Sequence, residues 1–216
     1  MKFEIITVTN LKQNCILIWD EITLNAIIID PGGDIEKIIN AIKQWSLKLI
    51  CILLTHGHID HVGGAKKLAT YFSVLIYGPG KKDDFLIKNL DTQSKIFSVV
   101  NHNNFIPDYW LNDGDDIHIE NIFFKTRLCP GHTPGHVVYI NNKDKLVLVG
   151  DVLFKGGIGR TDFPGGNFNV LIHSIKQVLL TLDDDYQVIP GHGPITYIGV
   201  ERQYNPFLSN LKKYSI

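Results

Sequence analysis

The sequence predicts an α/β fold, and three observations lead to that prediction. Short apolar, β-rich segments alternate with segments whose apolar residues recur at helical spacing, as in 35–45. The run 49–54 is apolar without alternation, which is typical of a strand covered on both faces. Strands come before and after a central helical stretch, which suggests two similar halves stacked together. Since 216 residues are the size of one α/β domain, we expect residues 1–216 to form a single domain.

The first third of the chain begins with strands. Apolar segments separated by Asn, Lys, Asp and Glu turn signals predict strands over 3–9, 15–19 and 24–30. Pro31-Gly32-Gly33 ends the third strand. Asp34 is placed to cap a helix over 35–45, in which isoleucines and Trp45 recur at helical spacing.

The strand 49–54 leads into the central part of the chain. We expect a helix over 61–72 and a short strand over 74–77. Asn, Asp and Lys are frequent in 79–115. There we expect a helix near 82–90 and then irregular structure up to a turn at 112–115.

The last part of the chain returns to strands. Apolar segments predict them over 117–128, 137–140, 145–149 and 187–189. A glycine-rich loop over 155–166 leads to a helix over 168–182, whose apolar residues recur at helical spacing. We expect a last helix near 199–213.

Composition and charge exclude several classes of protein. Hydrophobic residues at 44% and charged residues at 20% are globular values. A formal net charge of -1 disfavours a partner with a phosphate backbone, so we expect no nucleic acid. Because no run approaches the ~18 apolar residues of a membrane span, we expect no membrane partner. Residues 1–6 are typical of a first strand and not of a signal peptide.

The three cysteines, Cys15, Cys51 and Cys129, lie in apolar, strand-like contexts. Their odd number and scatter do not indicate a disulfide framework, which favours a reducing compartment and a cytoplasmic location. Cys129 lies three residues before His132 and is a candidate ligand by that spacing, but a buried apolar role is favoured.

The segment Thr55-His56-Gly57-His58-Ile59-Asp60-His61 places three imidazoles and a carboxylate in seven residues, directly after the strand 49–54. Such a cluster is what a metal site requires. His56 and His58, two residues apart at a strand end, point to the same side. Asp60 and His61, at the expected start of a helix, can reach a second point nearby. The spacing therefore predicts two ions.

Three further residues follow apolar strands in turns bounded by glycine or proline: His132, Asp151 and His192. Loops at the carboxyl ends of strands are where open α/β sheets place their ligands. The sum is five histidines and two aspartates that we expect to face one point. An all-nitrogen and oxygen set of ligands suits zinc, iron or manganese.

Four motifs, in order along the chain, closely resemble those of the metallo-β-lactamase superfamily. They are T-H-G-H-I-D-H at 55–61, P-G-H-T-P-G-H at 130–136, G-D at 150–151 and P-G-H-G-P at 190–194. The resemblance implies a four-layer αββα sandwich of two mixed sheets flanked by helices. It implies that His56, His58 and His132 hold a first metal. It also implies that Asp60, His61 and His192 hold a second, with Asp151 bridging the two.

Within that superfamily, Gly150 to Asn167 and the tail Gly191 to Phe207 look most like the compact, single-domain hydroxyacylglutathione hydrolases (type II glyoxalases). Those enzymes hydrolyse S-lactoylglutathione to lactate and glutathione in methylglyoxal detoxification. Arg160 aligns with a basic residue that contacts glutathione in the longer members, while a surface role is equally open. The longer members carry a C-terminal helical domain with further basic residues. Because about 24 residues follow His192 here, we expect looser recognition of small acyl thioesters.

The chemistry that we expect is hydrolysis. Two divalent ions, zinc as first choice with iron or manganese as alternatives, lower the pKa of a shared water and polarise an acyl oxygen. Asp60 would orient the resulting hydroxide and Asp151 would bridge the ions, so both are candidate catalytic residues. A thioester suits this site because thiolate leaves without a strong general acid.

The main alternative is a persulfide dioxygenase with a single iron, which shares the H-x-H-x-D-H run and a Gly-Arg-Thr-Asp-Phe segment. A β-lactamase, a tRNA-processing nuclease, the diiron half of a flavoprotein and a metal-stabilised binding module are less favoured. The sequence leaves the oligomeric state open. Among the remaining histidines, His136 is a candidate to support a ligand. His102, His118 and His173 are expected at the surface or in packing roles.

Overall fold

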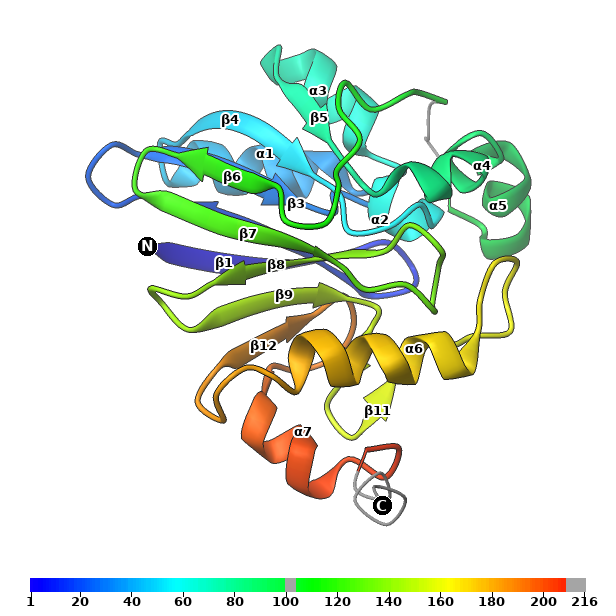
Figure 1. Cartoon of the computed structure of the whole chain (residues 1–216). Coiled ribbons are helices and arrows are strands. Elements are labelled where there is room, and N and C mark those ends of the chain that lie inside the picture. The colour runs from blue at the N-terminus through cyan, green and yellow to red at the C-terminus, as the bar shows by residue number, and fades with distance from the viewer. Residues whose placement is uncertain (100–103, 209–216) are drawn as a thin grey trace, which may run out of the picture.

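Two sheets, each built from one half of the chain, face one another in the computed structural model, which describes residues 1–99 and 104–208 (Figure 1). The first sheet has the order β1-β2-β3-β4-β5. Its strands are β1 Lys2–Val8, β2 Gln13–Trp19, β3 Asn25–Ile29, β4 Lys48–Leu53 and β5 Leu75–Tyr77. Strands β1 to β3 are antiparallel, and β3, β4 and β5 run parallel.

The second sheet has the order β13-β12-β9-β8-β7-β6. Its strands are β6 Asp116–Ile119, β7 Ile122–Leu128, β8 Val137–Asn141, β9 Leu146–Gly150, β12 Gln187–Pro190 and β13 Thr196–Tyr197. Only β12 and β9 pair in parallel in this sheet, so both sheets are mixed. A short hairpin, β10 Leu153–Phe154 and β11 Gly157–Ile158, lies apart from them. The short strand β13 was not predicted.

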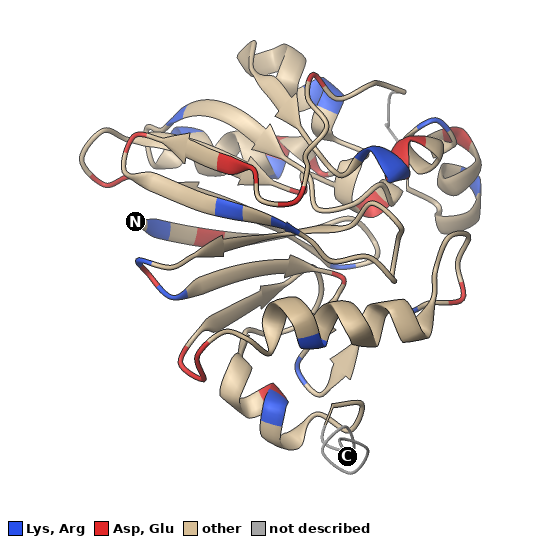
Figure 2. Cartoon of the chain, in the orientation of Figure 1, with Lys and Arg blue, Asp and Glu red and all other residues tan. Residues whose placement is uncertain are grey.

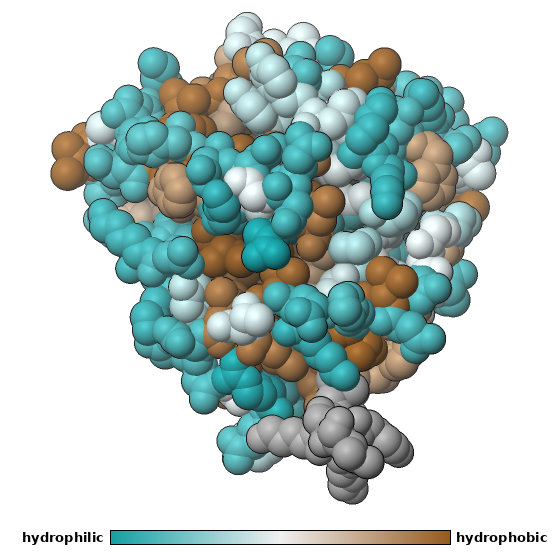
Figure 3. All heavy atoms as spheres, viewed as in Figure 1, coloured by the Kyte–Doolittle hydropathy of each residue, from teal (hydrophilic) through white to brown (hydrophobic). Residues whose placement is uncertain are grey.

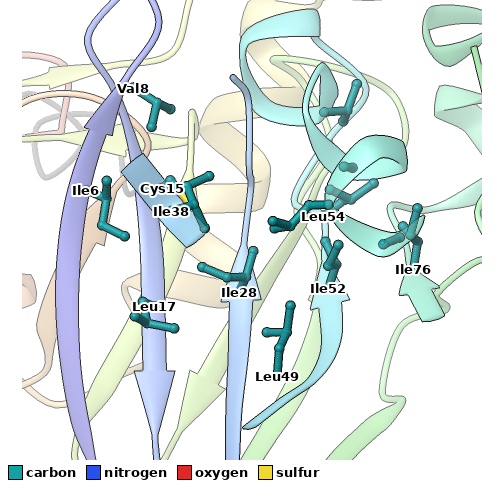
Figure 4. Close-up of a cluster of buried hydrophobic side chains, with 14 of the residues drawn as sticks. Ile6, Val8, Cys15, Leu17, Ile28, Ile38, Leu49, Ile52, Leu54 and Ile76 are labelled. Atoms are coloured by element: carbon teal, nitrogen blue, oxygen red, sulfur yellow. The ribbon is translucent and has the colours of Figure 1, made fainter. Parts of the chain in front are cut away.

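Strand alternation divides the apolar residues between the two faces of each sheet. Ile16 and Ile18 of β2 point into the core between the sheets, where they join Tyr139 and Leu148 of the second sheet. Leu17 points to the other face, toward α1 (Ile35–Gln44). Figure 4 shows this outer core, where Ile38 of α1 lies among side chains of the first sheet such as Cys15.

The outer face of the second sheet is covered in the same way. Val138 and Val147 pack with the helical segment formed by α6 (Phe168–Ser174) and a π-helical turn (Ile175–Leu179). The helix α7 (Ile198–Tyr204) lies on the same side. Three apolar cores between four layers confirm the αββα sandwich. They also confirm that β4 is covered on both faces, since Leu53 and Ile52 belong to different cores.

The predicted helix over 61–72 is wrong as a single element. The chain forms α2 (Ile59–Val62) and α3 (Ala65–Phe72), separated by Gly63-Gly64. Gly64 donates its N–H to the carbonyl of Pro31 at 2.8 Å, and a Cβ there would lie 2.6 Å from the same oxygen. This close backbone approach interrupts the helix. It leaves Asp60 and His61 on a separate first turn directly after β4.

Three further expectations need correction. Asp34 lies at the N-cap position of α1 with a φ of 45°, and its side chain makes no cap hydrogen bond. Instead its Oδ2 accepts from the Thr9 N–H and the Lys37 ammonium. The helix near 82–90 is a 3-10 turn (Lys81–Asp83) followed by α4 (Asp84–Ile87). The expected last helix is wrong beyond Tyr204, where α7 ends; 209–213 lie outside the described residues.

Irregular structure was expected after 90, but α5 (Leu90–Phe97) is helical. Its buried Gln93 anchors it: Oε1 accepts from the Ile59 N–H at 3.0 Å, and Nε2 donates to the Leu86 carbonyl at 2.9 Å. The helix α5 is therefore held against the start of α2 by a polar contact, which apolar periodicity does not reveal.

The surface carries mixed charges. Figure 2 shows Lys and Arg interspersed with Asp and Glu along the chain, whose formal net charge is -1. In the space-filling view of Figure 3, hydrophilic residues cover much of the visible face, with hydrophobic ones between them. Among the described residues, none of the helices has both the length and the hydrophobicity needed to cross a membrane.

The inter-sheet core provides a test of the fold. Leu148 is fully buried between the sheets, so Leu148→Ala removes packed methyl groups and leaves a cavity. We expect the free energy of unfolding of the metal-free protein to fall by about 2–5 kcal/mol, measured by urea denaturation. Leu75→Ala is the matched control, since that strand leucine is 45% exposed, and it should cost less than about 1 kcal/mol. Equal losses for the two variants would contradict the assignment of the core.

Candidate metal centre

All seven predicted ligand residues lie just beyond the carboxyl ends of four strands. His56 and His58 follow β4, and Asp60 and His61 lie on α2. From the second sheet, His132 follows β7, Asp151 follows β9 and His192 follows β12. Because both sheets bring strand ends to the same place, residues from 56 to 192 meet in space.

The first group consists of His56, His58 and His132. The Nδ1 atom of His58 lies 3.0 Å from Nε2 of His56 and 3.0 Å from Nε2 of His132. Two imidazole nitrogens on one tetrahedral zinc ion are about 3.3 Å apart. The three buried nitrogens therefore surround a point that suits one small ion.

The second group consists of Asp60, His61 and His192. Nε2 of His192 lies 3.2 Å from Oδ2 of Asp60, and Nε2 of His61 lies 3.8 Å from the same oxygen. The ligand atoms of this group lie within 4.8 Å of one another, as they do in the first group.

Asp151 lies between the two groups. Its Oδ1 is 3.4 Å from Nε2 of His61, on the side of the second group. Its Oδ2 is 3.7 Å from Nε2 of His132 and 3.6 Å from Nε2 of His192. One carboxylate therefore faces both groups, which is the geometry that a bridging ligand needs.

Two buried atoms at the centre lack a conventional hydrogen-bond partner. They are Nε2 of His61 and Oδ1 of Asp151. Buried polar atoms of native proteins are nearly always satisfied, so an unpaired nitrogen and oxygen that face each other call for another partner. A divalent cation fits this set of nitrogen and oxygen donors.

Burial keeps the imidazoles of the first group neutral. It lowers the pKa of His56 well below its usual value, lowers that of His58 to about 3 and also lowers that of His132. Neutral imidazole is the form that binds a metal. Burial would raise the pKa of Asp151, but nearby histidines, His61 first, outweigh it and hold the carboxyl ionised.

Carboxylates surround His61 and make this part of the site strongly negative. Burial lowers the pKa of His61, yet Asp151, Asp60 and Asp30 outweigh burial and raise it well above its usual value. The pKa of His192 is raised as well, because Asp60 and Asp151 outweigh its burial. The same field attracts cations to the second group.

Two residues that support the ligands were missed by the sequence analysis. Asp30 directly follows β3, and its Oδ2 accepts from Nδ1 of His61 at 2.8 Å and from the Thr55 hydroxyl at 2.6 Å. The Thr55 oxygen in turn lies 3.0 Å from Nδ1 of His56. These bonds place the proton on the remote nitrogen of each ring and leave Nε2 free to face the site. The available signal was a carboxylate at a strand end, the same pattern that identified Asp151.

Hydrogen bonds from the first sheet hold the loop that carries His192. Asn14 of β2 donates through Nδ2 to the carbonyls of Pro190 at 3.0 Å and Gly193 at 2.8 Å. Its backbone N–H donates to the Gly191 carbonyl at 2.8 Å. Asn14 was not predicted either, because its partners are nearly 180 residues away.

Arg160, the predicted substrate contact, stands at the edge of the site. Its carbonyl accepts from Nδ1 of His132 at 2.7 Å. Its exposed guanidinium makes two hydrogen bonds to Asp162 and lies 4.2 Å from the centre of the Phe163 ring. The Phe163 ring lies 5.5 Å from the ring of His58. The segment 160–163 therefore connects the surface to the first group.

The other candidates take supporting or peripheral places. His136 is buried, stacks on the ring of His56 and accepts the backbone N–H of Asp151 at 3.1 Å through Nε2. Cys129 is buried in the outer core of the second sheet, and all three cysteines are unpaired. His118 and His173 are exposed, and His102 lies outside the described residues.

Comparison with known proteins agrees with this geometry. A family model of the metallo-beta-lactamase superfamily matches residues 8–192. The hydroxyacylglutathione hydrolase GloC of Haemophilus influenzae is 48% identical over 211 residues, which are 97% of this chain and 99% of that protein.

Solved structures show the same similarity. The crystal structure of the BLEG-1 B3 metallo-beta-lactamase superposes with a TM-score of 0.89 at 34% identity, covering 96% of this chain and 100% of that one. The crystal structure of TTHA1623 in a di-iron-bound form gives a TM-score of 0.86 at 33% identity, covering 95% and 100%.

The support from Asp30 can be tested by replacement. Oδ1 of Asp30 accepts the Thr55 N–H, while Oδ2 accepts from His61 and the Thr55 hydroxyl, so in Asp30→Asn the amide NH₂ replaces the acceptor of one of these two sets of donors. We expect the affinity for a divalent ion to fall about 10–100-fold, measured by competition with a chelator. Asp34→Asn is the matched control, because Asp34 has the same left-handed backbone but is exposed and distant from these bonds. Unchanged affinity in Asp30→Asn would rule out this role.

Proposed function

Because the chain belongs to the metallo-beta-lactamase superfamily, we propose that it is a metal-dependent hydrolase of acyl-glutathione thioesters, with S-lactoylglutathione as the expected substrate. The observation that carries the proposal is the position of Asp151, whose carboxylate lies within 3.7 Å of His132 in the first group and of His61 and His192 in the second. The 48% identity to a hydroxyacylglutathione hydrolase over nearly the whole chain supports the substrate class. We treat residues 1–216 as one hydrolase domain.

The proposal assigns a role to each of the seven residues. His56, His58 and His132 would hold one ion, Asp60, His61 and His192 would hold the other, and Asp151 would bridge them. Zinc is the ion that we propose, and the di-iron form of a 33% identical protein supports iron as the alternative. When bound, such a pair lowers the pKa of water and polarises an acyl oxygen.

The chain's own residues shape the rest of the reaction. Burial would raise the pKa of Asp60, but His61 and His192 outweigh it and lower that pKa, so the carboxylate accepts a hydrogen bond from water and orients it. Burial raises the pKa of Cys51 and of Cys129 to about 12, so neither thiol supplies a nucleophile. Water adds to the acyl carbon as hydroxide, its proton is released to solvent, and the C–S bond breaks. The thiolate then takes its proton from solvent.

Arg160 is the proposed contact for glutathione, which carries two carboxylates. Its guanidinium is exposed and lies on the ring of Phe163, which itself packs against His58. A carboxylate of the substrate would share the guanidinium with Asp162 or displace it.

The cellular setting is proposed from the cysteines and the substrate. Three buried, unpaired cysteines support a reducing, cytoplasmic location. Hydrolysis of S-lactoylglutathione there would complete methylglyoxal detoxification. The partner is a small molecule and not a nucleic acid, given the interspersed surface charges.

The single-iron persulfide dioxygenase is not favoured, because the relative that matches 97% of the chain is a hydroxyacylglutathione hydrolase. The structural similarity to a B3 β-lactamase makes a β-lactam the second substrate class to assay.

The proposal predicts metal-dependent thioester hydrolysis. Purified protein should hold close to two metal equivalents, release glutathione from S-lactoylglutathione and lose that activity after chelation. Asp151→Ala should lower kcat/KM about a thousandfold or more, since about 4 kcal/mol of transition-state stabilisation is lost with the bridge. His173→Ala, on an exposed helix position, is the control and should keep full activity.

The same preparation should be assayed with glutathione persulfide under controlled oxygen and with a cephalosporin. Oxygen uptake with one tightly bound iron, or turnover of the β-lactam alone, would replace the thioesterase assignment. Full activity in Asp151→Ala would refute the bridging role.

The proposed glutathione contact makes a separate prediction. Arg160→Ala should raise KM for S-lactoylglutathione about tenfold and leave kcat within twofold, because it removes binding energy equal in ground and transition states. Arg127→Ala is the matched control, since Arg127 pairs with Asp113 on the surface as Arg160 pairs with Asp162. A fall in kcat at unchanged KM would exclude a simple binding role for Arg160.

A further inference from the structure

Asp83 is a buried carboxylate that the proposed reaction does not use. It ends the 3-10 turn Lys81–Asp83 and is fully inaccessible to solvent. Its neighbour Asp84, by contrast, is partly exposed and forms an ion pair with Lys88. A buried carboxylate is costly unless its oxygens are satisfied, so its partners show what holds it there.

Three donors satisfy Asp83. Its Oδ2 accepts the backbone N–H of Gly57 at 2.9 Å and the hydroxyl of Thr133 at 2.7 Å. Its Oδ1 accepts the backbone N–H of Gly135 at 2.6 Å. Burial raises the pKa of Asp83 to about 6, although these three bonds oppose the rise. Near neutral pH the group is therefore an ionised acceptor that faces only donors.

The donors belong to the two loops that carry the first group of ligands. Gly57 lies between His56 and His58, and Thr133 follows His132. One loop extends from β4 of the first sheet and the other from β7 of the second. Asp83 therefore links the two sheets at the candidate site, next to a backbone bond from Val137 to Thr55.

The contact leaves no room for adjustment. A Cβ on Gly57 would lie 2.8 Å from Cβ of Leu86, and one on Gly135 would lie 2.8 Å from Oδ1 of Asp83. The two loops thus reach the carboxylate through backbone positions that only glycine allows. Since short bonds to a charged acceptor are the strong ones, this side chain holds the two loops together beside the backbone bond from Val137 to Thr55.

We propose that Asp83 is a positioning residue that sets the distance between the His56–His58 loop and the His132 loop, so that their three nitrogens converge on one ion. The inference rests on the metal-binding role proposed above. It explains why Nδ1 of His58 and Nε2 of His132 lie 3.0 Å apart although their loops come from different sheets.

Asp83→Asn keeps the shape of the side chain but removes its charge and turns one of its two acceptor oxygens into an NH₂ donor. Whichever way the amide turns, its NH₂ group faces a backbone N–H, that of Gly57 or that of Gly135. Only the Thr133 hydroxyl can rotate to accept. One loop must then move away from the other, which disturbs the first group while the second keeps its own contacts.

The test measures metal affinity directly. Cobalt(II) titrations followed by visible absorption, with chelator competition for zinc, are compared for wild type, Asp83→Asn and the adjacent control Asp84→Asn. We expect Asp83→Asn to keep one tight equivalent and to bind the other about 10–100-fold more weakly, while Asp84→Asn matches wild type. If Asp83→Asn lowers the thermal stability of the metal-free protein but leaves both metal affinities unchanged, Asp83 has only a structural role. That result would overturn the proposal.

Thr133→Val covers the case in which Asp83→Asn does not fold, since it removes one donor and keeps the side-chain volume. It should weaken the same equivalent about threefold to tenfold, and unchanged affinities would overturn the proposal. If the double variant Asp83→Asn with Thr133→Val folds, its metal affinity should be little lower than that of Asp83→Asn alone, because both changes break the same contact. If wild type binds two ions but cleaves no thioester, the proposed function fails while this test stands.

Discussion

The site depends on the burial of three carboxylates around a single imidazole. Asp30, Asp60 and Asp151 lie 2.8, 3.8 and 3.4 Å from the nitrogens of His61 at the junction of the two sheets. Buried charges are costly unless they are paired, and the imidazoles of the first group are neutral because burial lowers their pKa. Positive charge is therefore favoured at this point. The carboxylates raise the pKa of His61 and His192, so protonated imidazole supplies that charge without an ion, and a pair of divalent cations supplies it in the proposed enzyme.

Hydrogen bonds from outside the ligand set determine which nitrogen of each ring faces that charge. Asp30 and Thr55 hold Nδ1 of His61 and His56, and the Arg160 carbonyl holds Nδ1 of His132. The Nε2 atoms are consequently turned inward before any ion binds. These supports come from both sheets, so the packing between the sheets and the orientation of the rings are parts of one arrangement.

Local sequence pattern explains how much of this arrangement could be predicted. The alternation in β2 and the unbroken apolar run of β4 identify their faces, and ligand residues after strand ends identify the site loops. Asp30 follows a strand end as Asp151 does, so the same pattern could have identified it. Asp83 carries no comparable signal, because it lies on a 3-10 turn and its partners are 26 to 52 residues away. The break between α2 and α3 likewise depends on contact with Pro31, and α5 depends on a buried glutamine. Tertiary contact decided each of these features.

The residues that border the proposed metal centre bear on the choice of substrate. The chain is similar in sequence to a protein named hydroxyacylglutathione hydrolase and in structure to one named B3 metallo-beta-lactamase, so one fold is found under names that imply different substrates. Specificity then has to come from residues that border the centre. Phe163 contacts both His58 and Phe97 of α5, while the Asn10 amide ties the Phe97 carbonyl to the β1–β2 turn. These contacts join three segments of the chain beside the first group of predicted ligands.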